Sequence, residues 1–399
     1  MICSPQSALL QRMRIAIDVE PVGFQNTGTG RMARELVLAM VNSHRGHSYT
    51  LYYSGRPGGE SRIMSAFSSV PRVSLKRLPF SPKVLYMSWI VCRRPRLERL
   101  IGPHDIYYSF VAQPFSAGGG VSSVTIHDLA VFNLPGAHSL KHKVITRSQI
   151  RASLKRIPLI ITPSEFTKGE LVGSLGIEAS RVAVIANGVS ACFRRLPDGA
   201  ATCSSKSRFD LPEHYIFYCG MLDRRKNIVR LVRAFRGAMG SLGPDYWLVL
   251  MGHPGYRYDE ILREVNQPDV NHRIRIIPGP ISDDVLVDLY RCAKLFAFPS
   301  LYEGFGIPPL EAMACGTPVV CSNTTAVAEV VGDAALTVDP TDVSSLSRAL
   351  IDGCLDTGLR ANLQEKGYRR ASQFSWKRSA AQLLGLFEST SAVGHGIKS

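Results

Sequence analysis

The chain has 399 residues, of which 45% are hydrophobic and 20% are charged, which fits two globular domains and excludes a disordered polymer. No run approaches the roughly 18 apolar residues that a membrane-spanning helix needs. Nearly all of the net charge of +15 lies in residues 1–200, where 25 Lys and Arg face 11 Asp and Glu. This imbalance indicates an anionic partner, although a solvated basic face without a partner is the alternative.

The first half alternates short apolar runs with helical patterns. Residues 1–12 lack a signal-peptide core and are expected to be a disordered extension. Buried strands are predicted over 14–19, 123–129, 158–164 and 182–188, with a helix over 31–41. Strands that alternate with helices predict a parallel sheet covered on both faces.

The same alternation restarts after residues 196–212, which are rich in Ser, Ala, Gly and Pro and are predicted to be a linker. Strands are predicted over 215–220, 246–252, 273–279, 294–300 and 317–322, with helices over 227–235 and 283–293. We therefore expect an α/β protein with two similar sheets and a ligand cleft at the carboxyl ends of their strands. Nine cysteines without a C-x-x-C pair favour reduced thiols and no zinc site.

Two motifs of the first half lie at expected strand ends. In TGTGR, Gly28 and Gly30 lead into a helix, where glycine lets the backbone approach an anion closely. Because Ala33 stands at the third position of a G-x-G-x-x-G motif, a nicotinamide-dependent oxidoreductase is disfavoured. His127 could hydrogen-bond a ligand hydroxyl across the cleft, or it could be a core histidine beside a helix-capping Asp128.

Basic residues follow the first strand of the second half in the segment GMLDRRKN, residues 220–227. The planar guanidinium of Arg225 and the ammonium of Lys226 suit a diphosphate, which requires both neutralisation and orientation. A merely basic turn is the alternative. Since the second half is otherwise close to neutral, adjacent cations at a strand end favour an anionic ligand.

The most specific segment is EGFGIPPLEAMACGTPVV, in which Glu303 and Glu311 are eight residues apart. Pro308 and Pro309 fit the first turn of a helix, and Glu311 lies near the positive end of that helix. A capping role for Glu311 is one interpretation. The other is that the two carboxylates bracket a hydroxyl-rich ligand while the N–H groups of residues 305–307 face it.

These motifs resemble retaining glycosyltransferases of family 4, which have the GT-B fold of two Rossmann-like domains across a cleft. The resemblance implies an acceptor-side domain over 13–200, a nucleotide-sugar domain over 201–373, and a C-terminal helix and tail over 374–399 that cross back. It implies that Arg225 and Lys226 bind the donor diphosphate, Glu311 the nucleotide ribose and Glu303 the donor sugar. It adds His127 and Gly30 from the first domain, and donor-binding backbone at Gly304, Phe305, Gly306 and Ile307. No cofactor or metal is expected.

The resemblance also implies the partners. The R-K-N sequence at Arg225 is similar to a branch rich in mannosyltransferases, so we predict GDP-mannose as donor, with UDP- or dTDP-sugars as alternatives. The acceptor is expected to be a sugar or a polyprenyl-diphosphate-linked saccharide in polysaccharide or lipopolysaccharide assembly. A nucleotide-sugar 2-epimerase and a non-catalytic binder are the rival classes. No nucleic-acid motif is visible.

The basic window over residues 72–99 holds eight Lys and Arg and one Glu, interleaved with apolar residues that include Leu85, Met87 and Trp89. This pattern is suited to an anionic membrane surface, so we predict a cytoplasmic enzyme bound peripherally to the inner face of the membrane. The alternative is that Trp89 and its neighbours pack in the core of the first domain.

Overall fold

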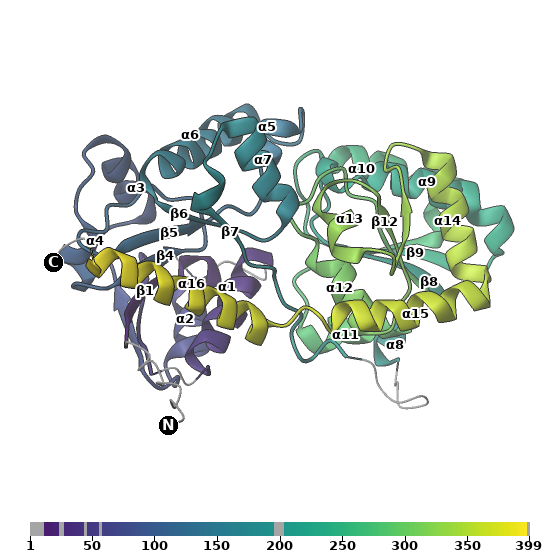
Figure 1. The fold of residues 1–399 in the computed structure, drawn as a ribbon. Coiled ribbons are helices and arrows are strands. Elements are labelled where there is room, and N and C mark those ends of the chain that lie inside the picture. Colours follow the sequence, from purple (N-terminus) through teal and green to yellow (C-terminus); the bar gives the residue numbers. More distant parts are fainter. Residues whose placement is uncertain (1–11, 24–27, 44–45, 56–57, 195–202, 397–399) are drawn as a thin grey trace, which may run out of the picture.

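A computed structural model of the chain describes residues 12–23, 28–43, 46–55, 58–194 and 203–396. Its strands form two parallel sheets, one from each half of the chain, and helices cover both faces (Figure 1). The predicted α/β class is therefore confirmed. The proposed extension falls almost wholly, and the proposed linker partly, outside the described residues. The domain boundaries stay a prediction.

The first sheet has the strand order β3-β2-β1-β4-β5-β6-β7, with every neighbouring pair parallel. Its strands are β1 (Arg14–Asp18), β2 (Ser48–Tyr53), β3 (Val73–Arg77), β4 (Ile106–Ser109), β5 (Val121–Thr125), β6 (Leu159–Thr162) and β7 (Val182–Val184). Its helices are α1 (Gly28–Val41), α2 (Glu60–Phe67), α3 (Pro82–Val91), α4 (Leu97–Ile101), α5 (Ala130–Asn133), α6 (Leu140–Arg156) and α7 (Glu165–Leu175), with short 3₁₀ turns η1 (Glu20–Gly23) and η2 (Ala179–Arg181).

The second sheet repeats this plan in the order β10-β9-β8-β11-β12-β13. Its strands are β8 (His214–Cys219), β9 (Tyr246–Gly252), β10 (Ile274–Pro278), β11 (Leu295–Phe298), β12 (Val319–Ser322) and β13 (Leu336–Val338). Its helices are α8 (Ser204–Phe209), α9 (Ile228–Leu242), α10 (Tyr258–Val265), α11 (Asp283–Cys292), α12 (Ile307–Ala314), α13 (Thr325–Val331), α14 (Val343–Leu355) and α15 (Thr357–Ala371), with the 3₁₀ turns η3 (Arg224–Lys226) and η4 (Asn271–Arg273).

Side chains of β1 alternate between two cores, as expected for a sheet buried on both faces. Ile15 and Ile17 pack in the layer that contains α1 and α2, whereas Ala16 packs in the layer that contains α3 and α6. β2 and β3 lie on one side of β1, whereas β4 and the later strands lie on its other side. The position between β1 and β4 is therefore a topological switch point. The loops that follow the carboxyl ends of β1 and β4, and of the equivalent strands β8 and β11, are the expected ligand-binding positions.

The last helix, α16 (Trp376–Gly396), leaves the second sheet and lies along the first, beside α1 (Figure 1). Trp376, Leu383 and Phe387 are buried in the same core as Ile15. The Phe387 ring centroid lies 5.6 Å from that of Tyr108 on β4. The core of the first half therefore includes residues from the end of the chain.

Two expectations need correction. β5 ends at Thr125, so His127 and Asp128 follow the strand in a loop and do not belong to it. Cys203 and Cys292 form a disulfide, with Cα atoms 5.9 Å apart, although reduced thiols were expected. They are 89 residues apart in the sequence, so no local spacing pairs them. The prediction held for Cys219, a buried free thiol whose pKa burial raises to about 12.

Candidate active site

A cavity of about 440 Å³ lies between the two sheets, at the carboxyl ends of their strands. The start of α1 and the loop at His127 line it from the first half. The second half lines the cavity with three segments, namely Met251 to His253, η3 and the start of α12. Nine of the ten predicted site residues line this cavity, namely His127, Arg225, Lys226, Glu303, Gly304, Phe305, Gly306, Ile307 and Glu311.

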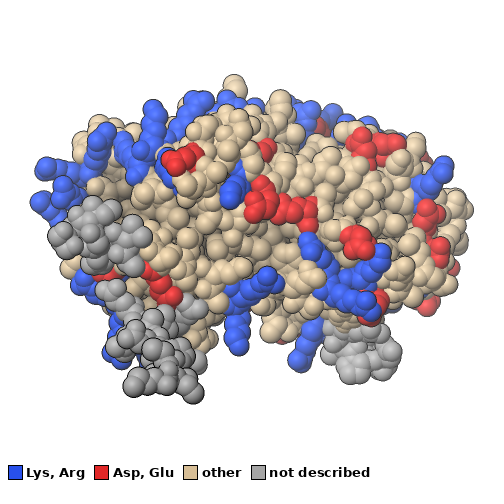
Figure 2. Space-filling model, viewed as in Figure 1, with Lys and Arg blue, Asp and Glu red and all other residues tan. Residues whose placement is uncertain are grey.

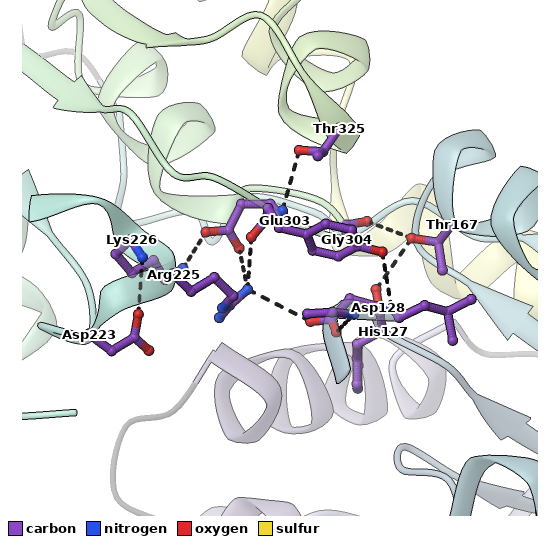
Figure 3. Close-up of polar contacts among 12 residues, drawn as sticks. His127, Asp128, Thr167, Asp223, Arg225, Lys226, Glu303, Gly304 and Thr325 are labelled. Atoms are coloured by element: carbon purple, nitrogen blue, oxygen red, sulfur yellow. Dashed lines mark hydrogen bonds and ion pairs between the residues drawn. The ribbon is translucent and has the colours of Figure 1, made fainter. Parts of the chain in front are cut away.

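Glu303 lies at the centre of a charged cluster with the two predicted diphosphate-binding residues (Figure 3). Its carboxylate accepts a hydrogen bond from Arg225 Nη1 at 3.2 Å and contacts Lys226 Nζ. Burial disfavours the ionised form of Glu303, but Lys226 and Arg225 outweigh it and hold the pKa of Glu303 below its usual value. The three side chains carry two positive charges and one negative charge, so the cluster keeps a net positive charge.

Lys226 is positioned by its own turn. The Asp223 side chain accepts a hydrogen bond from the Lys226 backbone N–H at 3.0 Å and so caps η3. Lys226 Nζ also lies 5.0 Å from the centre of the Phe298 ring. Burial lowers the pKa of Lys226, although contact with Glu303 opposes that effect. This lysine is therefore a desolvated cation directed into the cavity.

Glu311 makes contacts that the sequence did not predict. Arg31, on α1, donates a hydrogen bond to Glu311 at 2.6 Å and also contacts Asp283. The Tyr290 hydroxyl donates to the other carboxylate oxygen of Glu311 at 3.1 Å. Burial raises the pKa of Glu311, and Arg31 opposes this shift. Arg31 thus joins the first half to the predicted ribose-binding residue, and its position directly after Gly30, at the start of α1, was the available signal.

The first glycine of EGFG serves the contact between the two halves. A Cβ atom at Gly304 would lie 1.8 Å from the carbonyl oxygen of His127. Ser164 Oγ donates to the Gly304 carbonyl at 2.8 Å, and Arg225 Nη1 lies 3.8 Å from an Asp128 carboxylate oxygen. Figure 3 shows Gly304 and Arg225 facing His127 and Asp128. A side chain at position 304 would keep the two halves apart.

His127 and Gly30 differ from expectation in detail. His127 lines the cavity, but its Nε2 already pairs with the carbonyl of Phe110 at 2.7 Å, and burial lowers its pKa. The pairing with Phe110 fits the core-histidine interpretation, and a contact of His127 with a ligand stays a prediction. Gly30 is buried inside α1 and does not line the cavity, because the neighbouring residues Gly28 and Thr29 occupy that position.

Backbone N–H groups at the start of α12 are available at the wall of the cavity. Gly306, with φ of 107°, forms the turn that starts α12, whose first turn contains proline as predicted. The N–H groups of Phe305, Gly306 and Ile307 have no hydrogen-bond partner among the described residues. Together with the start of α1, they offer positive dipole ends to an anion from both sheets.

Comparisons with known proteins identify the family of this chain. Residues 202–370 match the family described as glycosyl transferases group 1, and residues 26–191 match glycosyltransferase family 4. Over 386 residues, the chain is 30% identical to the O-antigen chain mannosyltransferase B of Escherichia coli, covering 94% of this chain and 100% of the relative. The chain belongs to glycosyltransferase family 4. This glycosyltransferase is therefore an enzyme, and neither an epimerase nor a non-catalytic binder.

Solved structures share its fold. Sucrose-phosphate synthase from Thermosynechococcus elongatus superposes with a TM-score of 0.72 at 19% identity, covering 96% of this chain and all of that one. Anabaena HepE in complex with UDP-glucose superposes with a TM-score of 0.70 at 16% identity, covering 95% and 100%. The glycosyltransferase thus has the predicted GT-B fold. Its described residues contain no cluster of three His, Cys, Asp or Glu side chains that could hold a metal, and no helix long and apolar enough to span a membrane.

Proposed function

We propose that this glycosyltransferase moves mannose from GDP-mannose to a lipid-linked saccharide, with retention of anomeric configuration, during O-antigen or related polysaccharide assembly. The observation that supports this proposal most directly is the buried cluster of Arg225, Lys226 and Glu303, in a cavity that both halves of the chain line. The choice of mannose and of an O-antigen acceptor rests on the relative named above, which the match covers over its whole length. We also propose a cytoplasmic location, as predicted from the sequence.

The cluster suits departure of a nucleoside diphosphate. When the bond between the sugar C1 and the phosphate oxygen breaks, negative charge grows on the diphosphate and positive charge grows at C1. Fixed cations in a dry cavity stabilise the leaving group most strongly. We propose that the diphosphate competes with Glu303 for Arg225 and Lys226, and that Glu303 then accepts hydrogen bonds from hydroxyls of the donor sugar. The acceptor hydroxyl bonds to C1, and its proton passes to the leaving phosphate.

The test is nucleotide release from GDP-mannose, UDP-glucose, UDP-galactose and dTDP-rhamnose, with and without a lipid-linked saccharide extract. We expect acceptor-dependent release of GDP alone, reduced about 100-fold or more in Lys226→Ala and in Glu303→Gln. Lys366→Ala is the matched control, because Lys366 pairs with the exposed Asp333 far from the cavity. Release from another donor would overturn the assignment of mannose. Unchanged release by both variants would overturn the assigned roles.

We also propose that the first half binds a membrane surface, but with a different set of side chains from the one that the sequence suggested. Leu85 and Trp89 are each 2% exposed and belong to the core, as the alternative held. The other side of α3 exposes Val84, Met87 and Val91, and the adjacent α6 exposes Leu140 and Val144. Arg156 of α6 donates to the carbonyls of Trp89 and Ile90, which holds the two helices together.

Cations surround these exposed apolar side chains. Residues 81–97 and 139–157 contain no acidic residue, and Figure 2 shows Lys and Arg gathered over this part of the molecule. Apolar side chains that can insert, with cations beside them, match an anionic lipid surface, where each cation adds about 1 kcal/mol. We propose that α3 and α6 place the enzyme on the membrane that holds its acceptor.

Vesicle flotation tests this surface. Vesicles that contain phosphatidylglycerol should carry the enzyme, and neutral phosphatidylcholine vesicles should not. Met87→Asp with Val144→Asp should abolish the difference, whereas Leu355→Asp, at an exposed apolar site in the second half, should leave it unchanged. Equal flotation on both kinds of vesicle would overturn the proposal.

A further inference from the structure

Helix α7 of the first half contacts the segment of the second half that carries Glu303. The start of α7 is capped from the other half, because the Glu329 carboxylate accepts hydrogen bonds from the N–H groups of Glu165 and Phe166 at 3.0 and 2.9 Å. Side chains at the same helix start donate to the carbonyl of Gly304. The residue that follows Glu303 is therefore bonded to α7.

Tyr302, which directly precedes Glu303, is bonded to the first half as well. Its hydroxyl donates to the Glu170 carboxylate, on α7, and accepts a hydrogen bond from the Leu129 N–H at 3.3 Å. Tyr302 is buried, and its ring packs against that of Phe166 with the centroids 5.8 Å apart. The side chain thus fills its place in the contact, and its one polar atom is satisfied by two groups of the first half.

The backbone around Tyr302 is tied to the donor cluster. The Tyr302 carbonyl accepts a hydrogen bond at 3.0 Å from Arg225 Nη1, the same nitrogen that bonds Glu303. The Glu303 N–H donates to Thr325 Oγ1 at 3.3 Å (Figure 3). Thr325 has φ of 62°, a left-handed conformation that β-branched residues rarely adopt and that persists only where the surrounding structure holds it. The segment around Glu303 is therefore fixed by specific bonds.

Glu170 is the charged member of the contact. Its other carboxylate oxygen accepts a hydrogen bond from Asn133 Nδ2 at 2.5 Å, and no Lys or Arg of the described residues is paired with it. Burial raises the pKa of Glu170, and the hydrogen bonds from Tyr302 and Asn133 oppose that shift. A hydrogen bond to an ionised carboxylate is stronger than one between neutral groups, so loss of the Tyr302 hydroxyl should have a measurable effect.

We propose that Tyr302 is a positioning residue for the transfer reaction. Its hydroxyl fixes the Glu303 segment, and with it the donor sugar, against the first half, where the resemblance to the family places the acceptor. The diphosphate is assigned to Arg225 and Lys226, which both belong to the second half, so nucleotide binding does not need this contact. Transfer does need it. The inference rests on the proposed function, because it takes Glu303 as the group that holds the donor sugar.

Tyr302→Phe tests this role, because it keeps the ring and removes only the hydroxyl. With the active sugar nucleotide at saturation and a lipid-linked saccharide extract, we expect the rate of transfer to fall about tenfold. The Kd of the released nucleoside diphosphate, measured by calorimetry, should change by less than about threefold, since its assigned cations remain in place. An unchanged rate, or an equal loss of nucleotide affinity, would overturn the proposal.

A double-mutant cycle with Glu170→Ala tests whether the effect passes through the proposed contact. Both substitutions break the same hydrogen bond, so the double variant should be no more than about twofold slower than the slower single variant. Losses that multiply would show that Tyr302 acts elsewhere. The control Tyr215→Phe removes a buried hydroxyl that donates to the Leu289 carbonyl at 2.8 Å, so it should lower the melting temperature and leave the rate of transfer unchanged.

Hydrogen exchange in the free enzyme tests the contact without any donor. The Leu129 N–H should exchange about tenfold faster in Tyr302→Phe and at the wild-type rate in Tyr215→Phe, and equal protection in both would contradict the contact.

The donor panel separates this inference from the proposed function. Transfer from a sugar nucleotide other than GDP-mannose, slowed about tenfold by Tyr302→Phe, would refute the proposed donor and keep the role of Tyr302. Transfer from GDP-mannose at equal rates in the wild-type enzyme and in Tyr302→Phe would refute the role of Tyr302 and keep the donor.

Discussion

The substitution Gly304→Ala would separate the two halves of the molecule at the edge of the donor cavity. The new Cβ would lie 1.8 Å from the carbonyl oxygen of His127 and 2.8 Å from Asp128 Cβ. An ordinary contact needs at least 3.4 Å, so the backbones must move apart by about 1.6 Å. The nearest obstacle is backbone, which cannot rotate away as a flexible side chain would.

The energetic effect follows from the contacts that this movement breaks. The Gly304 carbonyl accepts hydrogen bonds from Ser164 at 2.8 Å and from Thr167 at 3.3 Å. Two such bonds contribute about 1 kcal/mol each, so the closed arrangement should lose about 2 kcal/mol. A shift of more than 1 Å between reacting groups can by itself cost about 100-fold in rate. We therefore expect kcat/KM to fall between about 30-fold and 100-fold.

Small-angle scattering, thermal unfolding and steady-state kinetics with the active donor test this prediction together. The radius of gyration should increase, while the cores of both sheets should remain intact. Gly240→Ala is the matched control, since a Cβ at that helical position meets nothing within 4 Å. It should leave both scattering and activity unchanged. A Gly304→Ala enzyme with wild-type scattering and wild-type kcat/KM would refute the reasoning.

Two further predictions concern buried charges. Arg31→Ala leaves Glu311 buried without its cation, so the free energy of unfolding should fall by about 2–3 kcal/mol in urea titration. Arg34→Ala, whose side chain is 39% exposed, should cost less than about 1 kcal/mol, and equal losses would contradict the role of Arg31. Burial raises the pKa of Asp18 to about 6 from 3.8, so the folded state binds a proton more tightly than the unfolded state. The contribution of Asp18 to the free energy of unfolding is therefore fully present below about pH 4. It is lost as the pH rises through about 6, and the total loss is about 3 kcal/mol. Asp18→Asn should flatten that part of the stability profile, and an unchanged profile would refute the assignment.

The sequence was most informative where several chemical requirements fall in one short segment. Glu303 and Glu311, eight residues apart around a glycine turn and a proline-started helix, were placed correctly at the cavity because their geometry is local. Arg31 was missed because its partner Glu311 is 280 residues away, and no pattern near Arg31 names a partner across two domains.

The window over residues 72–99 could be interpreted only in part from the sequence, for a different reason. α3 carries apolar residues on all sides, so periodicity could not tell which of them face the core. The structure divides them, with Leu85 and Trp89 inside and Met87 and Val91 outside. Gly304 was predicted to be donor-binding backbone. Its contact with His127 joins the two halves of the chain, so the sequence around Gly304 alone could not predict it.

The position of α16 has a consequence for biosynthesis. A ribosome makes the first sheet early, yet Trp376, Leu383 and Phe387, which fill one layer of its core, are made last. Until they emerge, the face of the sheet that holds Ile15 and Ile17 is left partly uncovered. The second half has its own separate core and does not depend on this delay. The half that is translated first is therefore the half that completes its folding last, and premature termination anywhere before residue 376 leaves a chain with an exposed apolar face.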